Sequence, residues 1–218
     1  KNKKIQVKNC AYLDHGDLIM GDNERIDNLD NIDCPYTTGL LDRFFLMPLV
    51  PIIETTRGCP FKCTFCSDGR DAANKIFRYS RERVDETLQY IAEHVQDCSQ
   101  LTISDLNFGM YSFDAGTAKT LARLQEEKGY PRSIMASAGK NQPERIIDIV
   151  ETVKGTGFIG AALQSTDPEV LEAIKRKNIS NEKILNLAEY GKEQGTLTYT
   201  EIILGLPKDS KEKHFESL

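Results

Sequence analysis

Short apolar segments rich in β-branched residues alternate with longer amphipathic segments from residue 50 onward, and this alternation limits the possible folds most strongly. The apolar segments, which we expect to form strands, are Val50–Thr56, Leu101–Ser104, Ile134–Ser137, Phe158–Gln164 and Leu197–Leu204. Strands that alternate with helices predict an α/β fold, with a parallel sheet and helices packed outside it. Right-handed crossovers then curl the sheet toward a barrel or leave it doubly wound, and in both folds ligands bind at the carboxyl ends of the strands.

The intervening segments carry signals for the start and the end of helices. Serine and aspartate can accept hydrogen bonds from the free N–H groups at a helix start, proline suits the first turn, and glycine often ends a helix. The expected helices are Arg81–Val95 after a cap at Ser80, Asp114 to Lys128 with Asp114 as cap and Gly129 as stop, Pro143 to Gly155, a short helix opening at Asp167-Pro168, one from Ser180 to Gly195, and the start of another at Ser210–Leu218. Residues 3–20 precede this pattern and predict a hairpin, with Ile5–Leu13 turning near residues 14–17.

Three of the six cysteines, Cys59, Cys63 and Cys66, fall within eight residues, directly after the first expected strand. The probability that this spacing arises by chance at this cysteine content is roughly 0.004. Pro60 follows Cys59 and breaks a helix that would begin before it, so the segment reads as a loop rather than as one face of a helix. The three thiols therefore lie where chemistry is expected in a parallel α/β fold.

Several interpretations of the three thiols compete. A disulfide is disfavoured because three thiols cannot all pair with one another and the cytosol is reducing. A zinc site needs a fourth ligand, and neither His15 nor His94 has the spacing of a zinc knuckle; a zinc-stabilised binding module without turnover remains the alternative. Thiolates also hold iron–sulfur clusters, and three of them leave one iron of a [4Fe–4S] cluster without a protein ligand.

The pattern Cys-x3-Cys-x2-Cys, with Phe65 before its last cysteine, resembles the signature of the radical S-adenosylmethionine (SAM) superfamily. The surrounding run from Pro51 to Phe61 is similar to the branch whose members often carry a cobalamin-binding domain ahead of the radical domain. The resemblance implies a partial TIM-type barrel of six β/α units, of which five strands are counted here. We therefore expect residues 1–49 to be a linker or remnant of a preceding domain, and residues 50–218 to be a partial barrel that lacks its last strand.

The resemblance also implies the cofactors and the reaction. The cluster ligands would be the three cysteines, and SAM would chelate the open iron through its amino and carboxylate groups. Reductive cleavage of SAM would then give a 5′-deoxyadenosyl radical that abstracts hydrogen from a small-molecule substrate, with the electron supplied by a donor such as a flavodoxin or ferredoxin. In cobalamin-type relatives a second SAM supplies a methyl group through the corrin, which would require a domain outside this chain.

Residues at the strand ends are the expected SAM contacts, and each has a structural alternative as a turn or core residue. The resemblance assigns Asp105 and Asn107 to the amino group, and Gln164 and Ser165 to the ribose or carboxylate. The residues expected beside the adenine are Phe65, Ile203, Gly205 and Leu206. No residue is singled out as a hydrogen donor or acceptor, and Arg57, Lys62 and Lys140 are assigned no role.

Composition narrows the remaining classes of protein. With 28 Lys and Arg against 33 Asp and Glu, the chain of 218 residues has a formal net charge of −5, which argues against a general nucleic-acid binder. The longest uncharged apolar stretch, Phe44–Ile53, is too short to span a bilayer, which needs roughly 20 apolar residues. The first residues form no apolar secretion signal, so a soluble cytoplasmic protein is the expectation.

Overall fold

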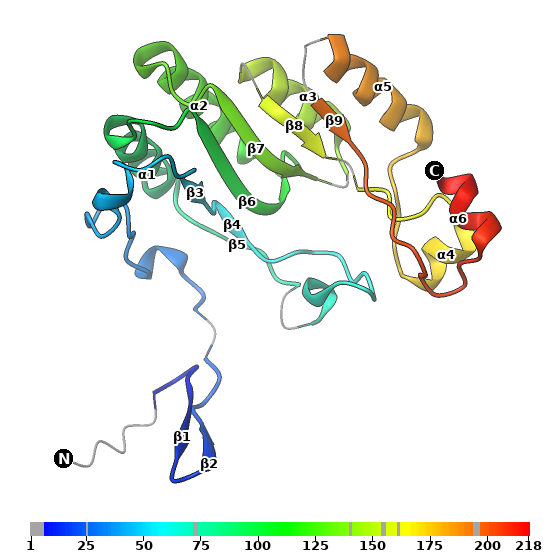
Figure 1. Ribbon diagram of the computed structural model, residues 1–218, viewed down its shortest axis with the longest axis horizontal. Helices are drawn as coiled ribbons and strands as arrows, with labels where there is room; N and C mark the ends of the chain where they lie inside the picture. The colour runs from blue at the N-terminus through cyan, green and yellow to red at the C-terminus, as the bar shows by residue number, and fades with distance from the viewer. Residues whose placement is uncertain are drawn as a thin grey trace.

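The computed structural model describes residues 7–24, 26–71, 74–139, 141–153, 156–160, 162–193 and 197–218. Its centre is a five-stranded sheet in the order β3-β6-β7-β8-β9, and all neighbouring strands in it are parallel (Figure 1). The strands are β3 (Ile52–Ile53), β6 (Gln100–Phe108), β7 (Ser133–Ala138), β8 (Thr156–Gly160) and β9 (Leu197–Tyr199). The predicted α/β fold with a parallel sheet is therefore confirmed.

The expected strands are all present, but their lengths differ from the prediction. The first ends at Ile53. After Glu54, the backbone N–H groups of Thr55 and Thr56 donate to the side chain of Asp105 rather than to a neighbouring strand of the sheet. The last ends at Tyr199, and only an isolated bridge between Gln164 and Ile202 continues the parallel pairing. Ala161, within the fourth expected strand, lies outside the described residues.

The helices agree more closely with the sequence pattern. They are α1 (Arg81–His94), α2 (Asp114–Lys128), α3 (Pro143–Thr152), α4 (Pro168–Ala173), α5 (Asn181–Glu193) and α6 (Lys211–Ser217). Ser80, Asp167 and Ser210 each accept a hydrogen bond from a backbone N–H of the first turn, as expected of caps. Gly155 and Gly195, expected as helix stops, lie outside the described residues.

Asp114 differs from its expected role. It is the first residue of α2 rather than its cap, and Phe113 occupies the cap position. The Asp114 carboxylate instead accepts hydrogen bonds from the backbone N–H groups of Gly109 and Tyr111, at 2.8 and 3.0 Å. The side chain therefore stabilises the turn between β6 and α2, because that turn offers free N–H groups nearer than those of the helix.

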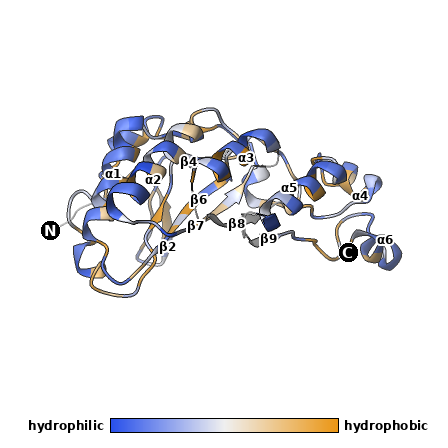
Figure 2. Cartoon of the chain, turned by 90° about the horizontal axis from the view of Figure 1, so that it is seen from above, coloured by the Kyte–Doolittle hydropathy of each residue, from blue (hydrophilic) through white to orange (hydrophobic). Residues whose placement is uncertain are grey.

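The main core lies between the sheet and the helices on one of its faces. Leu88 and Ile91 of α1, Leu121 and Leu124 of α2, and Leu101 and Ile103 of β6 are all at most 1% exposed. Figure 1 shows α1, α2, α3 and α5 along this side, and Figure 2 shows that they carry many hydrophilic residues. The helices are therefore amphipathic, as their sequence pattern predicts.

The opposite face of the sheet is not covered by these helices. Ile52 and Met135 lie in one row across the sheet, on either side of Thr102, and are 56% and 37% exposed. Leu106 and Tyr199 are also exposed, at 40% and 44%. An exposed row of large apolar side chains on strands indicates a surface that accommodates a ligand or further chain.

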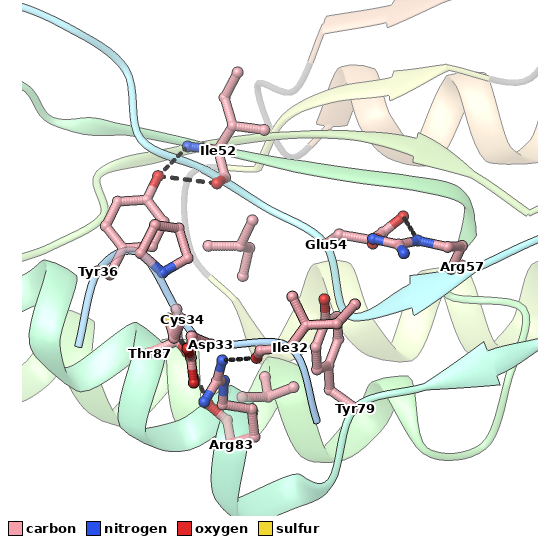
Figure 3. A pocket seen from close by; sticks show the side chains of 13 residues that line it. Ile32, Asp33, Cys34, Tyr36, Ile52, Glu54, Arg57, Tyr79, Arg83 and Thr87 are labelled. Carbon is pink, nitrogen blue, oxygen red and sulfur yellow. Dashed lines mark hydrogen bonds and ion pairs between the residues drawn. The ribbon is translucent and has the colours of Figure 1, made fainter. Parts of the chain in front are cut away.

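The segment before the sheet packs on α1 and on the edge strand β3. The hydroxyl of Tyr36 donates to the carbonyl of Ile52 at 2.9 Å and accepts from the N–H of Ile52 at 3.0 Å. Tyr36 thus hydrogen-bonds both backbone polar groups of Ile52. Phe45 is 6% exposed and belongs to the main core. A pocket of about 240 Å³ remains between this segment, β3 and α1, and Figure 3 shows Tyr36, Cys34 and Arg83 along its wall.

A hairpin precedes this segment. Its strands are β1 (Ala11–Asp14) and β2 (Asp17–Met20), and its turn lies at His15 and Gly16, which both have positive φ. The predicted turn is confirmed. The first strand is shorter than the expected Ile5–Leu13, because it begins at Ala11 and residues 7–10 form no strand; Ile5 itself lies outside the described residues. Among the described helices, none is long and apolar enough to cross a membrane.

Replacement of Tyr36 by Phe tests the attachment of this segment. The variant loses two hydrogen bonds to β3, so we expect its free energy of unfolding to fall by about 1–2 kcal/mol. Urea unfolding followed by circular dichroism measures the change. Tyr12→Phe, at an exposed tyrosine of the hairpin, is the matched control and should leave stability unchanged; equal stability of the Tyr36 variant and the unaltered protein would contradict the assignment.

Candidate cofactor-binding site

The three clustered cysteines lie in one loop whose two ends are held together. The loop leaves β4 (Thr56–Arg57) and returns in β5 (Phe77–Arg78), and these two strands pair in antiparallel fashion. Gly58, directly before Cys59, has φ of +104°, a conformation that glycine adopts without strain. The chain therefore turns sharply out of β4 into the cysteine loop.

The interior of the loop is fixed by backbone contacts. The N–H of Cys66 donates to the carbonyl of Cys63 at 3.2 Å, and the N–H of Gly69 donates to the carbonyl of Cys66 at 3.1 Å. A Cβ atom at Gly69 would lie 2.2 Å from the Cys63 carbonyl oxygen, so only glycine fits there. Cys59 and Cys63 are 5% and 3% exposed, whereas Cys66 is partly exposed.

Asp105 attaches the start of the loop to the central sheet. Its carboxylate accepts hydrogen bonds from the backbone N–H groups of Thr55 and Thr56, at 2.7 and 3.2 Å, and from both threonine hydroxyls. Burial raises the pKa of Asp105 above its ordinary value, and these hydrogen bonds counter part of the rise. The predicted contact between Asp105 and an ammonium group stays a prediction.

Asn107, two residues further along β6, reaches the first cysteine. Its side-chain amide donates from Nδ2 to the Sγ of Cys59 at 3.4 Å, and the residue is 2% exposed. Its Oδ1 is buried and has no hydrogen-bond partner. A buried polar atom without a partner costs free energy, so Oδ1 is placed to accept a hydrogen bond from a ligand.

Arg176 was not anticipated from the sequence. It is 6% exposed and lies close enough to all three cysteines for electrostatic interaction. Burial lowers the pKa of its guanidinium, while the negative charge of the three thiolates acts in the opposite direction. Its other hydrogen bonds, to the Asn178 side chain at 2.7 Å and to the Ala162 carbonyl, hold it in the site.

The position of Arg176 follows from the end of α4. Lys175 has φ of +53°, which turns the chain back after the helix, and the N–H of Arg176 donates to the carbonyl of Leu171. The carbonyl of Ile174 accepts a hydrogen bond from Thr64, so this turn packs against the cysteine loop. In the sequence, Arg176 lies between two lysines and looks like part of a solvated charged segment, which is why no sequence signal identified it.

Two further buried polar groups lie after β6. Burial raises the pKa of Tyr111 to about 12, with a contribution from the charge of Cys59, and raises the pKa of Asp114 to about 7. The hydroxyl of Tyr111 and one carboxylate oxygen of Asp114 are buried without a hydrogen-bond partner.

The residues predicted after β8 have different surroundings. Gln164 is 6% exposed, has φ of +67°, and its side-chain Oε1 is buried without a partner. Ser165 is 3% exposed, and its hydroxyl accepts from the N–H of Asp167 and contacts the hydroxyl of Ser217 in α6. Gln164 therefore has an oxygen free to bind a ligand, whereas the Ser165 hydroxyl already contacts the chain.

The predicted adenine contacts come from two segments. Leu206 is buried against Val170 and Ile174, with Ile203 packed on the same small core. Gly205 has φ of +79°, and a Cβ atom there would meet no atom within 4 Å. Phe65 of the cysteine loop is 37% exposed. The contact of these residues with an adenine stays a prediction. The exposed ring of Phe65 and the open space at Gly205 are consistent with it.

The donor set fits a thiolate-bound cluster. Three thiols lie in one loop beside a buried cation, and the side chains of Asn107 and Gln164 each have a buried oxygen without a hydrogen-bond partner. Within the described ranges, no three His, Cys, Asp or Glu side chains are grouped so that they could hold a single metal ion. The zinc alternative has no ligand set among those residues.

The family model for the radical SAM superfamily matches residues 53–218, which are 166 of the 218 residues, and the chain belongs to this superfamily of enzymes. Enzymes of the superfamily use a [4Fe–4S] cluster and SAM. The resemblance inferred from the cysteine pattern is thereby confirmed.

Among individual proteins, the chain is 33% identical over 196 residues to the cobalamin-dependent radical SAM methyltransferase TokK of Streptomyces tokunonensis. It is 34% identical over 196 residues to 2-(S-pantetheinyl)-carbapenam-3-carboxylate methyltransferase of Streptantibioticus cattleyicolor. Both alignments cover 86% of this chain but only 28% of the relative. The chain thus spans less than a third of the length of these curated relatives.

Solved structures show the same fold. The cobalamin-dependent S-adenosylmethionine radical enzyme OxsB, with aqua-cobalamin and S-adenosylmethionine bound, matches with a TM-score of 0.66 and 16% identity, over 95% of this chain and 31% of that one. The radical SAM methyltransferase TsrM of Kitasatospora setae matches with a TM-score of 0.65 and 17% identity, over 78% of this chain and 33% of that one.

Gly69→Ala tests the geometry of the cysteine loop. The added Cβ clashes with the Cys63 carbonyl, so the loop must change shape, and we expect bound iron and sulfide per chain to fall severalfold after anaerobic reconstitution. Colorimetric iron and sulfide analysis measures the effect. Ser67→Ala, at an exposed residue of the same loop, is the control and should bind normal amounts; full cluster content in the Gly69 variant would show that the loop tolerates the Cβ.

Proposed function

We propose that this chain is a catalytic radical SAM domain in which Cys59, Cys63 and Cys66 hold a [4Fe–4S] cluster and SAM binds beside it. The observation that carries the proposal is that buried Arg176 and the Asn107 amide both lie beside the three-cysteine loop. The side chains of Asn107 and Gln164 also each keep a buried oxygen without a hydrogen-bond partner. Membership of the superfamily supports the same cofactors. A reduced cluster held by Cys59, Cys63 and Cys66 would supply the electron for cleavage of SAM to methionine and a 5′-deoxyadenosyl radical, and that radical would remove a hydrogen atom from the substrate.

The side chains of the site divide the recognition of SAM among them. The guanidinium of Arg176 can bind a carboxylate through charge-assisted hydrogen bonds, which are strong in a buried position. Asn107 Oδ1 and Gln164 Oε1 can accept hydrogen bonds from an ammonium group and from hydroxyl groups. Phe65 and Ile203 offer apolar surface to a flat ring, while buried Leu206 packs with Ile203, and the open space at Gly205 allows the ring to approach the backbone. Ser165 supports this surface through the turn that leads to Asp167.

We also propose that the sheet is part of a partial (β/α)6 barrel formed by residues 50–218, with residues 1–49 leading into it. The uncovered face with Ile52, Leu106 and Met135 supports this arrangement, because it would form the interior of the barrel. In that position the face shields a reactive intermediate from water and stray hydrogen donors. The fold shared with OxsB and TsrM gives independent support.

The reaction class that we favour is cobalamin-dependent methyl transfer to a small molecule. The two relatives at 33% and 34% identity are both methyltransferases, and one is named as cobalamin-dependent. Cobalamin would be bound outside this chain, and an external donor such as a flavodoxin or ferredoxin would supply the electron. The exposed side chains Leu106 and Met135 favour a substrate with an apolar portion.

Cys63→Ala tests the proposal. With one ligand removed, we expect the release of 5′-deoxyadenosine from SAM and dithionite to fall to the level of a reaction without protein. Cys98→Ala, at a cysteine outside the loop, is the matched control and should keep normal release. Undiminished release by the Cys63 variant would contradict the proposed ligand role, and a colourless protein that retains stoichiometric zinc would contradict the proposed function altogether.

A further inference from the structure

The two ends of the Asn107 side chain have unequal surroundings. Its Nδ2 lies 3.4 Å from Cys59 Sγ, while its Oδ1 is buried without a partner, although the residue as a whole is only 2% exposed. An amide turned the other way would place an oxygen against the sulfur, and two acceptors repel each other. The orientation therefore matches a sulfur that accepts a hydrogen bond, as a cluster-ligating sulfur would.

The backbone of β6 fixes Asn107 at this place. Asp105 on the same strand is bound to Thr55 and Thr56 at the entrance of the cysteine loop, so the strand and the loop are already joined two residues earlier. The register between β6 and β7 shifts after Ile103, and the carbonyl of Asn107 accepts from Met110 in the turn that follows. The position of Asn107 is therefore set by β6 and its contacts, and not by the contact with Cys59.

A hydrogen bond to a cluster-ligating sulfur changes the balance between the oxidation states of the cluster. Reduction adds negative charge that is partly carried by the sulfurs, and an N–H donor stabilises that charge more than it stabilises the oxidised form. Loss of the donor should consequently lower the reduction potential. In a dry site this effect is not screened by water.

We infer that Asn107 is a positioning residue that raises the reduction potential of the cluster through Cys59, and that the same amide turns its Oδ1 toward the bound cofactor. The inference rests on the proposed function, because it requires a cluster on the three cysteines. Asn107 would thus both raise the reduction potential and accept a hydrogen bond from the cofactor. The two roles are linked, because the hydrogen bond from Nδ2 to Cys59 fixes the orientation of the amide and therefore of Oδ1.

Asn107→Leu and Asn107→Asp test the inference, because both side chains have nearly the size of asparagine and neither carries the amide donor. The reconstituted intact protein is titrated without SAM, and the reduced cluster is followed by electron paramagnetic resonance. At the wild-type midpoint we expect about a tenfold lower ratio of reduced to oxidised cluster in Asn107→Leu, which corresponds to about 59 mV for one electron. The reduction potential of Asn107→Asp should be lower still, because the new carboxylate adds negative charge beside the sulfur.

The control is Asn186→Asp, which makes the same change at an exposed position of α5 and should leave the midpoint unchanged. SAM affinity, measured by calorimetry on the oxidised protein, is the second readout and should weaken in Asn107→Leu, which has no side-chain acceptor. If the Asn107 variants and the unaltered protein have the same reduction potential at the same iron content, the inference is overturned and the proposed function remains intact. Folded variants that hold no cluster would assign Asn107 to assembly of the loop instead, which also overturns it. Failure of the unaltered protein to take up a cluster would contradict the proposed function.

Discussion

The cysteine loop depends on one buried carboxylate, that of Asp105. It accepts from two backbone N–H groups and two hydroxyls of Thr55 and Thr56, and thereby ends β3 and directs the chain away from the sheet toward Cys59. Hydrogen bonds to a charged group contribute more than neutral ones, about 1.5–3 kcal/mol each. These bonds offset part of the desolvation of a carboxylate that is 1% exposed. The loop can therefore be both irregular in its backbone and fixed in its position.

Electrostatic balance is the second constraint on the site. In the proposed cluster site, three thiolates in one loop would repel each other, and buried Arg176 is a positive charge that interacts with all three cysteines. The cation comes from a turn more than a hundred residues further along the chain, held by the contact between Thr64 and Ile174. Sulfur ligands and guanidinium thus come together only in the folded protein, which links formation of the site to correct packing of α4.

The sequence predicts the parts of this protein that depend on local patterns. The alternation of apolar and amphipathic segments suffices for the parallel sheet and the helices, and the cysteine spacing suffices for the superfamily. The roles of Asp105 and Arg176 depend on contacts between distant segments, so they could not be predicted: Asp105 resembles a turn residue or a ligand contact, and Arg176 resembles a surface charge. The length of β3 was overestimated for the same reason, since the competing acceptor, Asp105, is on another strand.

The central claim is that three sulfurs hold a four-iron cluster with one iron left open to SAM. Mössbauer spectroscopy of the ⁵⁷Fe-reconstituted protein, before and after addition of SAM, tests this most directly. The account predicts a [4Fe–4S] spectrum in which one of the four iron sites changes its isomer shift and quadrupole splitting when SAM is added. A spectrum that is unchanged by saturating SAM, or one that shows no four-iron cluster, would contradict it.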